Sequence, residues 1–250
     1  MAGDTVRICL WSGPRNISTA TMRSFEARGN CAVWDEPFYA WYLKETGIDH
    51  PGREETLALW PHDADEIARR CAGPAPNGEA EFFQKHMCQH MLPGLDLSWT
   101  AACRHIFLIR DPAEVAASYF ATMDRATSAD LGALRQLALF DEIAHVTGRS
   151  DWPVVEGRDV LADPAGMLRA VCAAIDIPFR TSMLSWPAGR RASDGPWAPF
   201  WYARVEASTG FDAPRASPHP LPDGLEPVVA ACRPAYEALR RRKLAAPRAR

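Results

Sequence analysis

The chain has 250 residues, of which 47% are hydrophobic and 24% charged, and its formal net charge is −3 at pH 7. This composition is ordinary for a soluble globular protein and excludes a disordered chain, a collagen-like chain and a coiled coil. The slightly acidic balance also argues against a nucleic-acid partner, because domains that bind nucleic acids are usually basic. The length fits one large domain, and we expect a single domain over residues 1–250.

Short apolar runs alternate along the chain with segments that suit a helix. In chain order, the pattern predicts a strand at Val6–Trp11, a helix at Ser18–Arg28, a strand at Cys31–Trp34, a helix near Asp63–Cys71, a strand at Ile106–Ile109, a helix at Glu114–Tyr119, a strand at Trp152–Glu156, a helix at Pro164–Ile175 and a C-terminal helix at 225–243. Strands that alternate with helices favour an α/β fold of three layers, in which a mostly parallel sheet is flanked by helices.

Two segments depart from this alternation. Residues 44–80 form loops around one short helix, and residues 186–222 are rich in Pro, Gly, Ser and Trp. The second segment is too long for an ordinary loop without structure, and its aromatic side chains argue against disorder. These aromatics include Trp186, Trp197, Phe200, Trp201 and Tyr202. We therefore expect a lid or a binding loop at 186–222.

The sequence predicts a cytoplasmic location. No apolar run approaches the ~20 residues that cross a bilayer, and the N-terminal MAGDTVRICLWSG lacks the features of a signal peptide. Seven widely spaced cysteines without a C-x-x-C pair argue against a disulfide framework and a zinc ribbon. The basic run at 240–243 fits a helix C-terminus better than a membrane or nucleic-acid site.

The first motif is a strand, a turn and a helix in the segment RICLWSGPRNISTATMRSF. A helix N-terminus attracts anions through its free N–H groups and its dipole. Arg15 adds a fork of donors, and Ser18 and Thr19 add hydroxyls. This layout is that of a phosphate-binding loop, although it does not match G-x-x-x-x-G-K-[ST], which disfavours ordinary ATP or GTP binding. The alternative is a capped helix without a ligand.

The second motif lies in IFLIRDPAEVAASY, where a strand delivers Arg110 at its carboxyl end. Ligands of open α/β sheets bind at that end of the strands. Ser118 follows eight residues later, about two turns into the next helix. An arginine and a hydroxyl in these places can hold a second phosphate. The alternative is an ion pair between Arg110 and Asp111 or another neighbouring acid.

Together the two motifs resemble the sulfotransferase family that uses 3′-phosphoadenosine 5′-phosphosulfate (PAPS) as donor. The chain is most similar to bacterial sulfotransferase-like proteins with an SGPRN loop, a DEP segment and a QKHM segment. The resemblance implies the P-loop NTPase-like sulfotransferase fold. It also implies transfer of a sulfuryl group to a hydroxyl or amine of a small-molecule acceptor. The sequence shows no clear set of carboxylates for a metal ion, so we expect no metal, and its charge and hydropathy predict no nucleic-acid or membrane partner.

The resemblance also implies where the donor binds. Its 5′-phosphosulfate is expected on the loop residues Pro14, Arg15, Asn16, Ile17, Ser18 and Thr19, and its 3′-phosphate on Arg110 and Ser118. A late basic loop with Gly and Trp contacts the donor in the family. By composition, Arg190, Arg191 and Trp197 are the corresponding candidates here.

For catalysis, the resemblance points to Arg15 and Lys85 as the cations beside the leaving phosphate. Glu36 looks like the glutamate base of protein-tyrosine sulfotransferases, and His86 is the rival base, because cytosolic sulfotransferases use Lys-x-His. Here Lys85 and His86 are adjacent, so in an extended segment they point to opposite faces. If the segment is helical, His86 and His90 lie one turn apart and both line a cleft.

Two other functions stay open at this stage. Ile17 stands where relatives carry a glycine, and the Lys-x-His spacing is missing, so the chain also fits a non-catalytic nucleotide-binding member of the fold. A P-loop kinase is a weaker alternative, because the Gly-Lys-Ser/Thr ending of the loop is absent.

Overall fold

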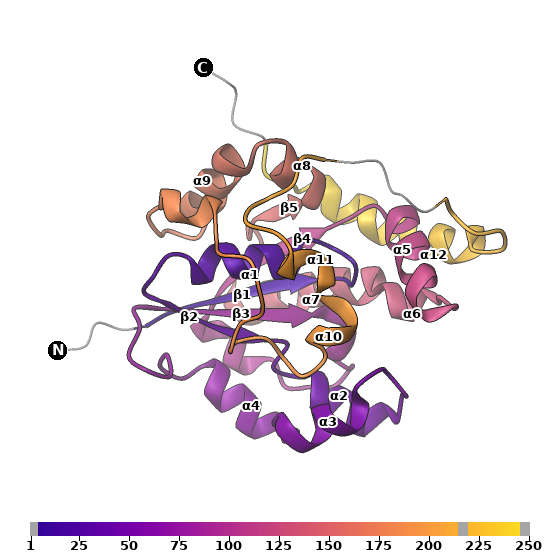
Figure 1. Cartoon of the computed structure of the whole chain (residues 1–250), viewed down its shortest axis with the longest axis horizontal. Coiled ribbons are helices and arrows are strands. Elements are labelled where there is room, and N and C mark those ends of the chain that lie inside the picture. Colours follow the sequence, from indigo (N-terminus) through magenta and orange to yellow (C-terminus); the bar gives the residue numbers. More distant parts are fainter. Residues whose placement is uncertain (1–4, 215–219, 246–250) are drawn as a thin grey trace.

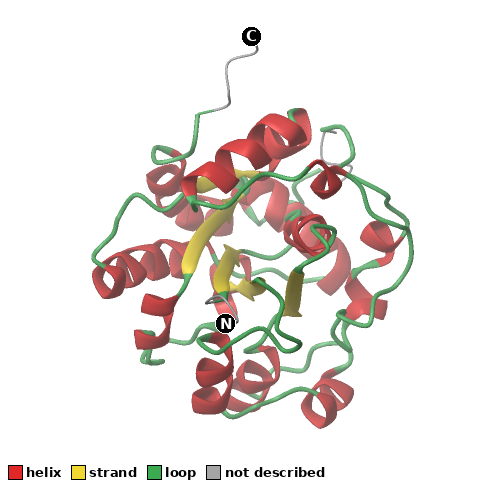
Figure 2. Cartoon of the chain, turned by 90° about the vertical axis from the view of Figure 1, so that its left-hand side faces the viewer, coloured by secondary structure: helices red, strands yellow, loops and turns green. Residues whose placement is uncertain are grey.

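The computed structural model describes residues 5–214 and 220–245. At its centre lies a five-stranded parallel sheet with the strand order β2-β3-β1-β4-β5, and helices surround it (Figures 1 and 2). The strands are β1 Val6–Ser12, β2 Cys31–Asp35, β3 Glu81–Met87, β4 Arg104–Ile109 and β5 Val154–Glu156. The predicted α/β fold of three layers is confirmed, and β3 is a strand of the sheet rather than a helix.

The helices that were predicted are present with small shifts at their ends. They are α1 Ser18–Glu26, α4 Ala64–Cys71, α5 Pro112–Met123, α9 Pro164–Ala174 and α12 Glu226–Arg240. The other helices are α2 Tyr39–Thr46, α3 Arg53–Leu59, α6 Ser128–Leu131, α7 Ala133–Thr147, α8 Gly157–Ala162, α10 Ala198–Trp201 and α11 Ala203–Glu206. Three 3₁₀ turns complete the described secondary structure, namely η1 Cys88–His90, η2 Ser98–Ala102 and η3 Thr181–Leu184.

The sheet is buried on both faces, which explains why its strands read as short apolar runs. Successive side chains of a strand point to opposite faces. In β1, Ile8 and Leu10 pack with α1 and α9, while Cys9 and Trp11 belong to the core under α4, α7 and α12. These helices are thus divided between two apolar cores, one on each side of the sheet.

The two helices that begin with proline have the same type of N-terminus. Asp111 accepts a hydrogen bond from the backbone of Ala113 at the start of α5, and Asp163 accepts one from Gly166 at the start of α9. A proline at the first helical position has no N–H that needs a partner. The cap and the proline fix where α5 leaves β4, which places Ser118 on the first turns of that helix.

Residues 186–214, which we call the late segment, pack beside the carboxyl ends of the strands, where α10 and α11 lie (Figure 1). Trp197, Ala198 and Tyr202 form a buried cluster with Tyr39 and Leu43 from α2. The segment is therefore attached to α2 by its own aromatic side chains. Residues 215–219 of the predicted 186–222 loop lie outside the described part of the chain.

The basic end of α12 pairs with acids of the neighbouring elements. Lys243 Nζ lies 2.8 Å from carboxylate oxygens of both Glu156 and Asp159, and Arg240 Nε lies 3.8 Å from Glu156 Oε2. These contacts agree with the interpretation of the run as a helix C-terminus.

Candidate functional site

A cavity of about 800 Å³ lies where the strands of the sheet end, the place where open α/β sheets bind ligands. Most of the residues singled out from the sequence line it: Pro14, Arg15, Asn16, Ile17, Ser18, Thr19, Glu36, Lys85, Arg110, Ser118 and Trp197. Three do not, namely His86, Arg190 and Arg191.

The turn between β1 and α1 forms the first part of the cavity wall. Arg15 has a left-handed backbone with a φ of 55°, whereas Ile17 has an ordinary φ of −86°. The branched side chain of Ile17 is therefore unstrained, and the loop needs no glycine at that position. No side chain caps the first turn of α1, so its free N–H groups make this part of the wall electropositive.

Two arginines from the two motifs meet beside this turn. Arg15 Nε donates to Ser118 Oγ over 3.0 Å, and Arg110 Nη1 donates to the main-chain carbonyl of Arg15. Arg110 also forms an ion pair with Glu114, with 3.0 Å between Nε and Oε2. Burial, and then the charge of Arg110, lower the pKa of Arg15. An anion at this place would relieve the repulsion between the two cations.

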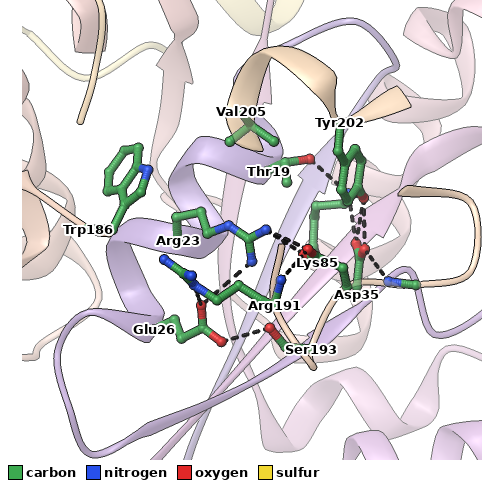
Figure 3. A network of polar contacts seen from close by, with 12 residues as sticks. Thr19, Arg23, Glu26, Asp35, Lys85, Trp186, Arg191, Ser193, Tyr202 and Val205 are labelled. Atoms are coloured by element: carbon green, nitrogen blue, oxygen red, sulfur yellow. Dashed lines mark hydrogen bonds and ion pairs between the residues drawn. The ribbon is translucent and has the colours of Figure 1, made fainter. Parts of the chain in front are cut away.

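Lys85 comes from β3, which pairs with β2 so that Lys85 lies opposite Asp35. Its Nζ is 2.7 Å from Asp35 Oδ1, 2.8 Å from Glu36 Oε1 and 3.1 Å from Thr19 Oγ1 (Figure 3 shows Lys85, Asp35 and Thr19). Burial opposes the charge on Lys85, but Asp35 and Glu36 raise its pKa well above the usual value. Lys85 is therefore a permanent buried cation at the cavity wall.

Glu36 follows β2 and also has a left-handed backbone, with a φ of 41°. Its amide donates to the carbonyl of Lys85 over 2.9 Å, which continues the sheet pairing by one residue. Burial raises the pKa of Glu36 to about 7, with a contribution from Asp35 and against the lowering effect of Lys85. A carboxyl group with this pKa can take up a proton near neutral pH.

Tyr202 joins the late segment to this charged cluster. Its hydroxyl donates to Asp35, with 2.8 Å to Oδ2, and accepts from Trp197 Nε1 over 3.0 Å. Lys85 also donates to the same hydroxyl, and the amide of Gly195 donates to Asp35 Oδ2 over 3.1 Å. The part of the late segment at the cavity is thus tied to β2 and β3 by a polar network (Figure 3).

The prediction that His86 lines the site is wrong, because β3 is extended and directs Lys85 and His86 to opposite faces. The His86 ring stacks on Trp11 at a centroid distance of 4.5 Å, and its Nε2 lies 3.2 Å from Gln84 Oε1. Burial lowers its pKa to about 3. His86 is a core residue of the face covered by α4, α7 and α12.

His90 does line the cavity, although not together with His86. It lies in the turn η1 after β3, and its Nδ1 is 3.8 Å from Glu36 Oε2. Its ring stacks on Tyr39 at 4.4 Å and on Tyr42 at 4.8 Å. The end of the strand, and not a helical repeat, brings this histidine beside Glu36.

The placement of Arg190 and Arg191 at the donor site is also wrong. Arg190 is exposed, while Arg191 Nε lies 3.6 Å from Glu26 Oε2 and its amide donates to Asp194. Arg23 Nη2 contacts the same Asp194 at 2.6 Å, and Figure 3 shows Arg23 and Arg191 beside Glu26. Arg23 and Arg191 fasten the late segment to α1. The prediction rested on composition, which does not show where a side chain points.

The sequence does not single out Tyr39, His50 or Tyr119, which lie with Tyr42 in the aromatic part of the cavity wall. Tyr39 and Tyr42 follow Glu36 with the spacing of one helical face, so a helix predicted after β2 was the available signal. His50 lies in the loop after Gly47, the residue that ends α2. The sequence around His50 does not indicate that this loop returns to the cavity.

Within residues 5–214 and 220–245, no helix is long and apolar enough to cross a membrane. All seven cysteines are buried and unpaired. The same described ranges contain no group of three or more His, Cys, Asp or Glu side chains that could hold a metal ion.

The sequence profile of the sulfotransferase domain matches residues 6–243. Two Arabidopsis thaliana proteins, the branched-chain-amino-acid aminotransferase-like proteins 2 and 1, are 33% and 32% identical to the chain. The matches cover 92% of this chain and 40% and 41% of the plant proteins, so the chain spans about two fifths of their length.

Two solved structures share the fold. The first is a sulfotransferase from Alicyclobacillus acidocaldarius, with a TM-score of 0.55, 14% identity, and coverage of 97% of this chain and 98% of that chain. The second is the sulfotransferase domain of the Synechococcus PCC 7002 olefin synthase, with a TM-score of 0.53, 15% identity, and coverage of 95% and 96%.

Proposed function

The chain belongs to the sulfotransferase domain family, and we propose that it transfers a sulfuryl group from PAPS to a small-molecule acceptor. One observation carries the proposal: Arg15, Lys85 and Glu36 line the same cavity at the carboxyl ends of the strands. Two cations and a carboxyl group with a pKa near neutrality are what sulfuryl transfer requires. The first two stabilise a leaving phosphate, and the third accepts the proton of the acceptor.

In the proposed reaction, a bond forms between the acceptor oxygen or nitrogen and the sulfur of the donor. The bond between sulfur and the bridging phosphate oxygen breaks, and the leaving group is adenosine 3′,5′-bisphosphate (PAP). Glu36 takes the proton of the acceptor, and the negative charge that gathers on the leaving phosphate is stabilised by Lys85 and Arg15. By analogy with phosphoryl transfer, positioning and electrostatics account for most of the rate.

For the donor, we propose that the turn between β1 and α1 holds the 5′-phosphosulfate. Arg110 and Ser118 are proposed to hold the 3′-phosphate. The contact between Arg15 and Ser118 supports this assignment, because it brings the two phosphate-binding motifs within one side-chain length. Trp197 lines the same cavity and remains a candidate for contact with the donor.

We also propose that the acceptor is a small molecule and that the reaction takes place in the cytoplasm. The cavity of about 800 Å³ has a size typical of small-molecule sites. The buried, unpaired thiols of all seven cysteines are typical of a reducing compartment.

The first test is calorimetric binding of PAP, ADP, ATP and AMP to the purified protein, followed by transfer of label from [³⁵S]PAPS to a broad panel of alcohols and amines. We expect selective binding of PAP and labelling of at least one acceptor. PAP binding without transfer would support the non-catalytic member of the fold, and stronger binding of ATP would support a kinase. If folded protein binds none of these nucleotides, the proposal is wrong.

A further inference from the structure

Three hydrogen-bonding atoms at the cavity are buried and have no partner among the described residues. They are His90 Nδ1, His50 Nε2 and Gln89 Oε1, and all three residues line the cavity. Buried polar atoms are nearly always paired in folded proteins, and an unpaired one costs about 1–3 kcal/mol. A ligand in the cavity can supply the hydrogen bonds that these three atoms lack.

His90 is the best defined of the three. Its side chain is 4% exposed, and its Nδ1 lies 3.8 Å from Glu36 Oε2, which is too far for a direct hydrogen bond. One oxygen atom can lie within normal hydrogen-bond distance, about 2.8 Å, of both atoms at the same time. The two atoms are therefore close enough for one hydroxyl oxygen to form a hydrogen bond with each of them.

A hydroxyl also matches the chemistry of this gap, because it donates one hydrogen bond and accepts others. The carboxylate of Glu36 can only accept. The nearby negative charge favours the tautomer in which His90 carries its proton on Nδ1. A protonated amine has no lone pair for that N–H, so it satisfies Glu36 and leaves His90 unpaired.

His50 marks a second point of the same subsite. Its Nδ1 pairs with the hydroxyl of Tyr39 over 2.9 Å, which leaves Nε2 without a partner. Its ring packs near Tyr39 and Tyr42, with centroids 6.0 and 6.3 Å apart, and His90 stacks on the same two rings. The two histidines thus share one aromatic wall.

The charges around this wall disfavour an anionic acceptor. Burial lowers the pKa of both His50 and His90, so neither ring offers a positive charge to a carboxylate or phosphate near neutral pH. The carboxylate of Glu36 lies next to His90, and among the charges that act on His50 Asp130 has a larger effect than Arg125. Both carboxylates oppose an anion at this wall, whereas the cations Arg15, Lys85 and Arg110 of the same cavity are assigned to the donor. The aromatic rings offer apolar contact to the body of an uncharged molecule.

We propose that the acceptor is an uncharged alcohol with a second hydroxyl group. The reacting hydroxyl lies between Glu36 and His90, and the second hydroxyl meets His50. This inference rests on the proposed sulfuryl transfer. In the transfer, the reacting oxygen forms its bond to sulfur, Glu36 receives its proton, and PAP leaves. His90 positions the oxygen and takes no proton.

The test compares matched acceptors with [³⁵S]PAPS: cyclohexanol, cyclohexane-1,2-diol, 4-hydroxycyclohexanecarboxylate and cyclohexylamine. We expect the diol to have the highest kcat/KM, by at least tenfold over the mono-alcohol. His90→Phe retains the stacking but removes Nδ1, and we expect it to lower kcat/KM for the diol about 10–100-fold while the Kd for PAP changes less than twofold. His50→Phe should raise KM for the diol several-fold more than KM for cyclohexanol.

Two further variants separate positioning from general damage. His90→Asn places an amide N–H near the position of Nδ1 and should recover part of the lost kcat. His86→Phe changes a histidine that is buried on the opposite face of the sheet, and its kinetics should match those of the wild type. Near-UV circular dichroism and thermal melting check that each variant is folded.

The outcomes separate this inference from the proposed function. If the wild type binds PAP but prefers the amine, the anion or the mono-alcohol, the acceptor class is wrong and sulfuryl transfer stands. The inference is also overturned if His90→Phe and His50→Phe behave like His86→Phe. If the wild type neither binds PAP nor transfers label, the proposed function itself is wrong.

Discussion

Arg15 Nε and Ser118 Oγ lie 3.0 Å apart and form a hydrogen bond between residues that are 103 positions apart in the chain. The bond joins the turn after β1 to α5, and Arg110 strengthens the junction by donating to the carbonyl of Arg15. The two predicted phosphate-binding motifs are therefore one continuous surface. A ligand with two phosphate groups can contact both motifs, and each contact affects the other through this hydrogen bond.

The first prediction concerns Arg15. Arg15→Ala removes a half-buried cation and its hydrogen bonds, and bonds to charged groups contribute about 1.5–3 kcal/mol. We therefore expect the Kd for PAP to rise roughly 10–100-fold, measured by titration calorimetry. The control is Arg70→Ala, because the Arg70 side chain is 51% exposed and does not line the cavity. Equal PAP affinity in the two variants would exclude Arg15 from the donor site.

The second prediction concerns the stability that Lys85 provides. Lys85→Met leaves the buried carboxyl groups of Asp35 and Glu36 without their cation, and breaking a buried pair costs about 3–5 kcal/mol. Lys85 lowers the pKa of Glu36, so its removal raises that pKa further above the ~4.3 of an unfolded glutamate. A carboxyl group with a raised folded-state pKa destabilises the fold progressively as pH increases between the two values.

The loss of unfolding free energy should therefore be larger at pH 8 than at pH 5. Urea unfolding at both pH values measures it, with Lys44→Met, an exposed lysine of α2, as the control. A loss that does not depend on pH, or one that is larger at pH 5, would contradict the role of Lys85 as the partner of Glu36.

The third prediction concerns Glu36 as the base. Because its pKa is raised to about 7, kcat/KM should fall about tenfold per pH unit below that value, as the carboxylate becomes protonated, and should level off above it. Glu36→Gln should lower kcat about 10²–10⁴-fold with a Kd for PAP within a few-fold of the wild type. Its residual activity should lack the transition near pH 7. If Glu36→Gln keeps the transition near pH 7, the transition belongs to another titratable group and Glu36 is not the base.

The sequence predicts the sheet and the helices that face one apolar core, because burial on both faces gives short apolar runs and a helical repeat. It does not predict β3, α2 or α7. The side chains of α2 pack against the cavity wall and the late segment as well as against the apolar core. The sequence of α2 therefore lacks the regular helical repeat of apolar residues by which a helix is predicted. Among the elements that were not predicted, the strand β3 matters most for the arrangement of the site. It separates Lys85 from His86 and places His90 beside Glu36.

Local patterns also locate the strand ends, and therefore Arg15, Glu36 and Arg110, because ligand sites of parallel sheets follow strand ends. They do not locate contacts made by long connections. Asp194 attaches the late segment to Arg23 of α1, and Tyr202 attaches it to Asp35. Both contacts join residues more than 160 positions apart, and no local spacing encodes them. Composition alone was the basis for Arg190 and Arg191, and it was insufficient.

The last prediction concerns Tyr202 as the attachment of the late segment. Tyr202→Phe removes the hydroxyl that bonds Asp35, Lys85 and Trp197, and it leaves the buried Nε1 of Trp197 without its acceptor. An unpaired buried donor costs about 1–3 kcal/mol, and we expect the free energy of unfolding to fall by that amount. The amides of 195–206 should exchange faster in hydrogen–deuterium exchange, while those of β1 change only with global stability.

Tyr236→Phe is the matched control, because it also removes one tyrosine hydroxyl at the cavity, but that hydroxyl donates to Glu156 of β5. It should leave the exchange of 195–206 unchanged. Since Trp197 and Tyr202 both line the cavity, faster exchange in Tyr202→Phe should be accompanied by a higher KM for the acceptor. If exchange in 195–206 is the same in both variants, the aromatic packing on α2 holds the segment by itself, and the hydroxyl of Tyr202 serves Lys85 and Asp35 only.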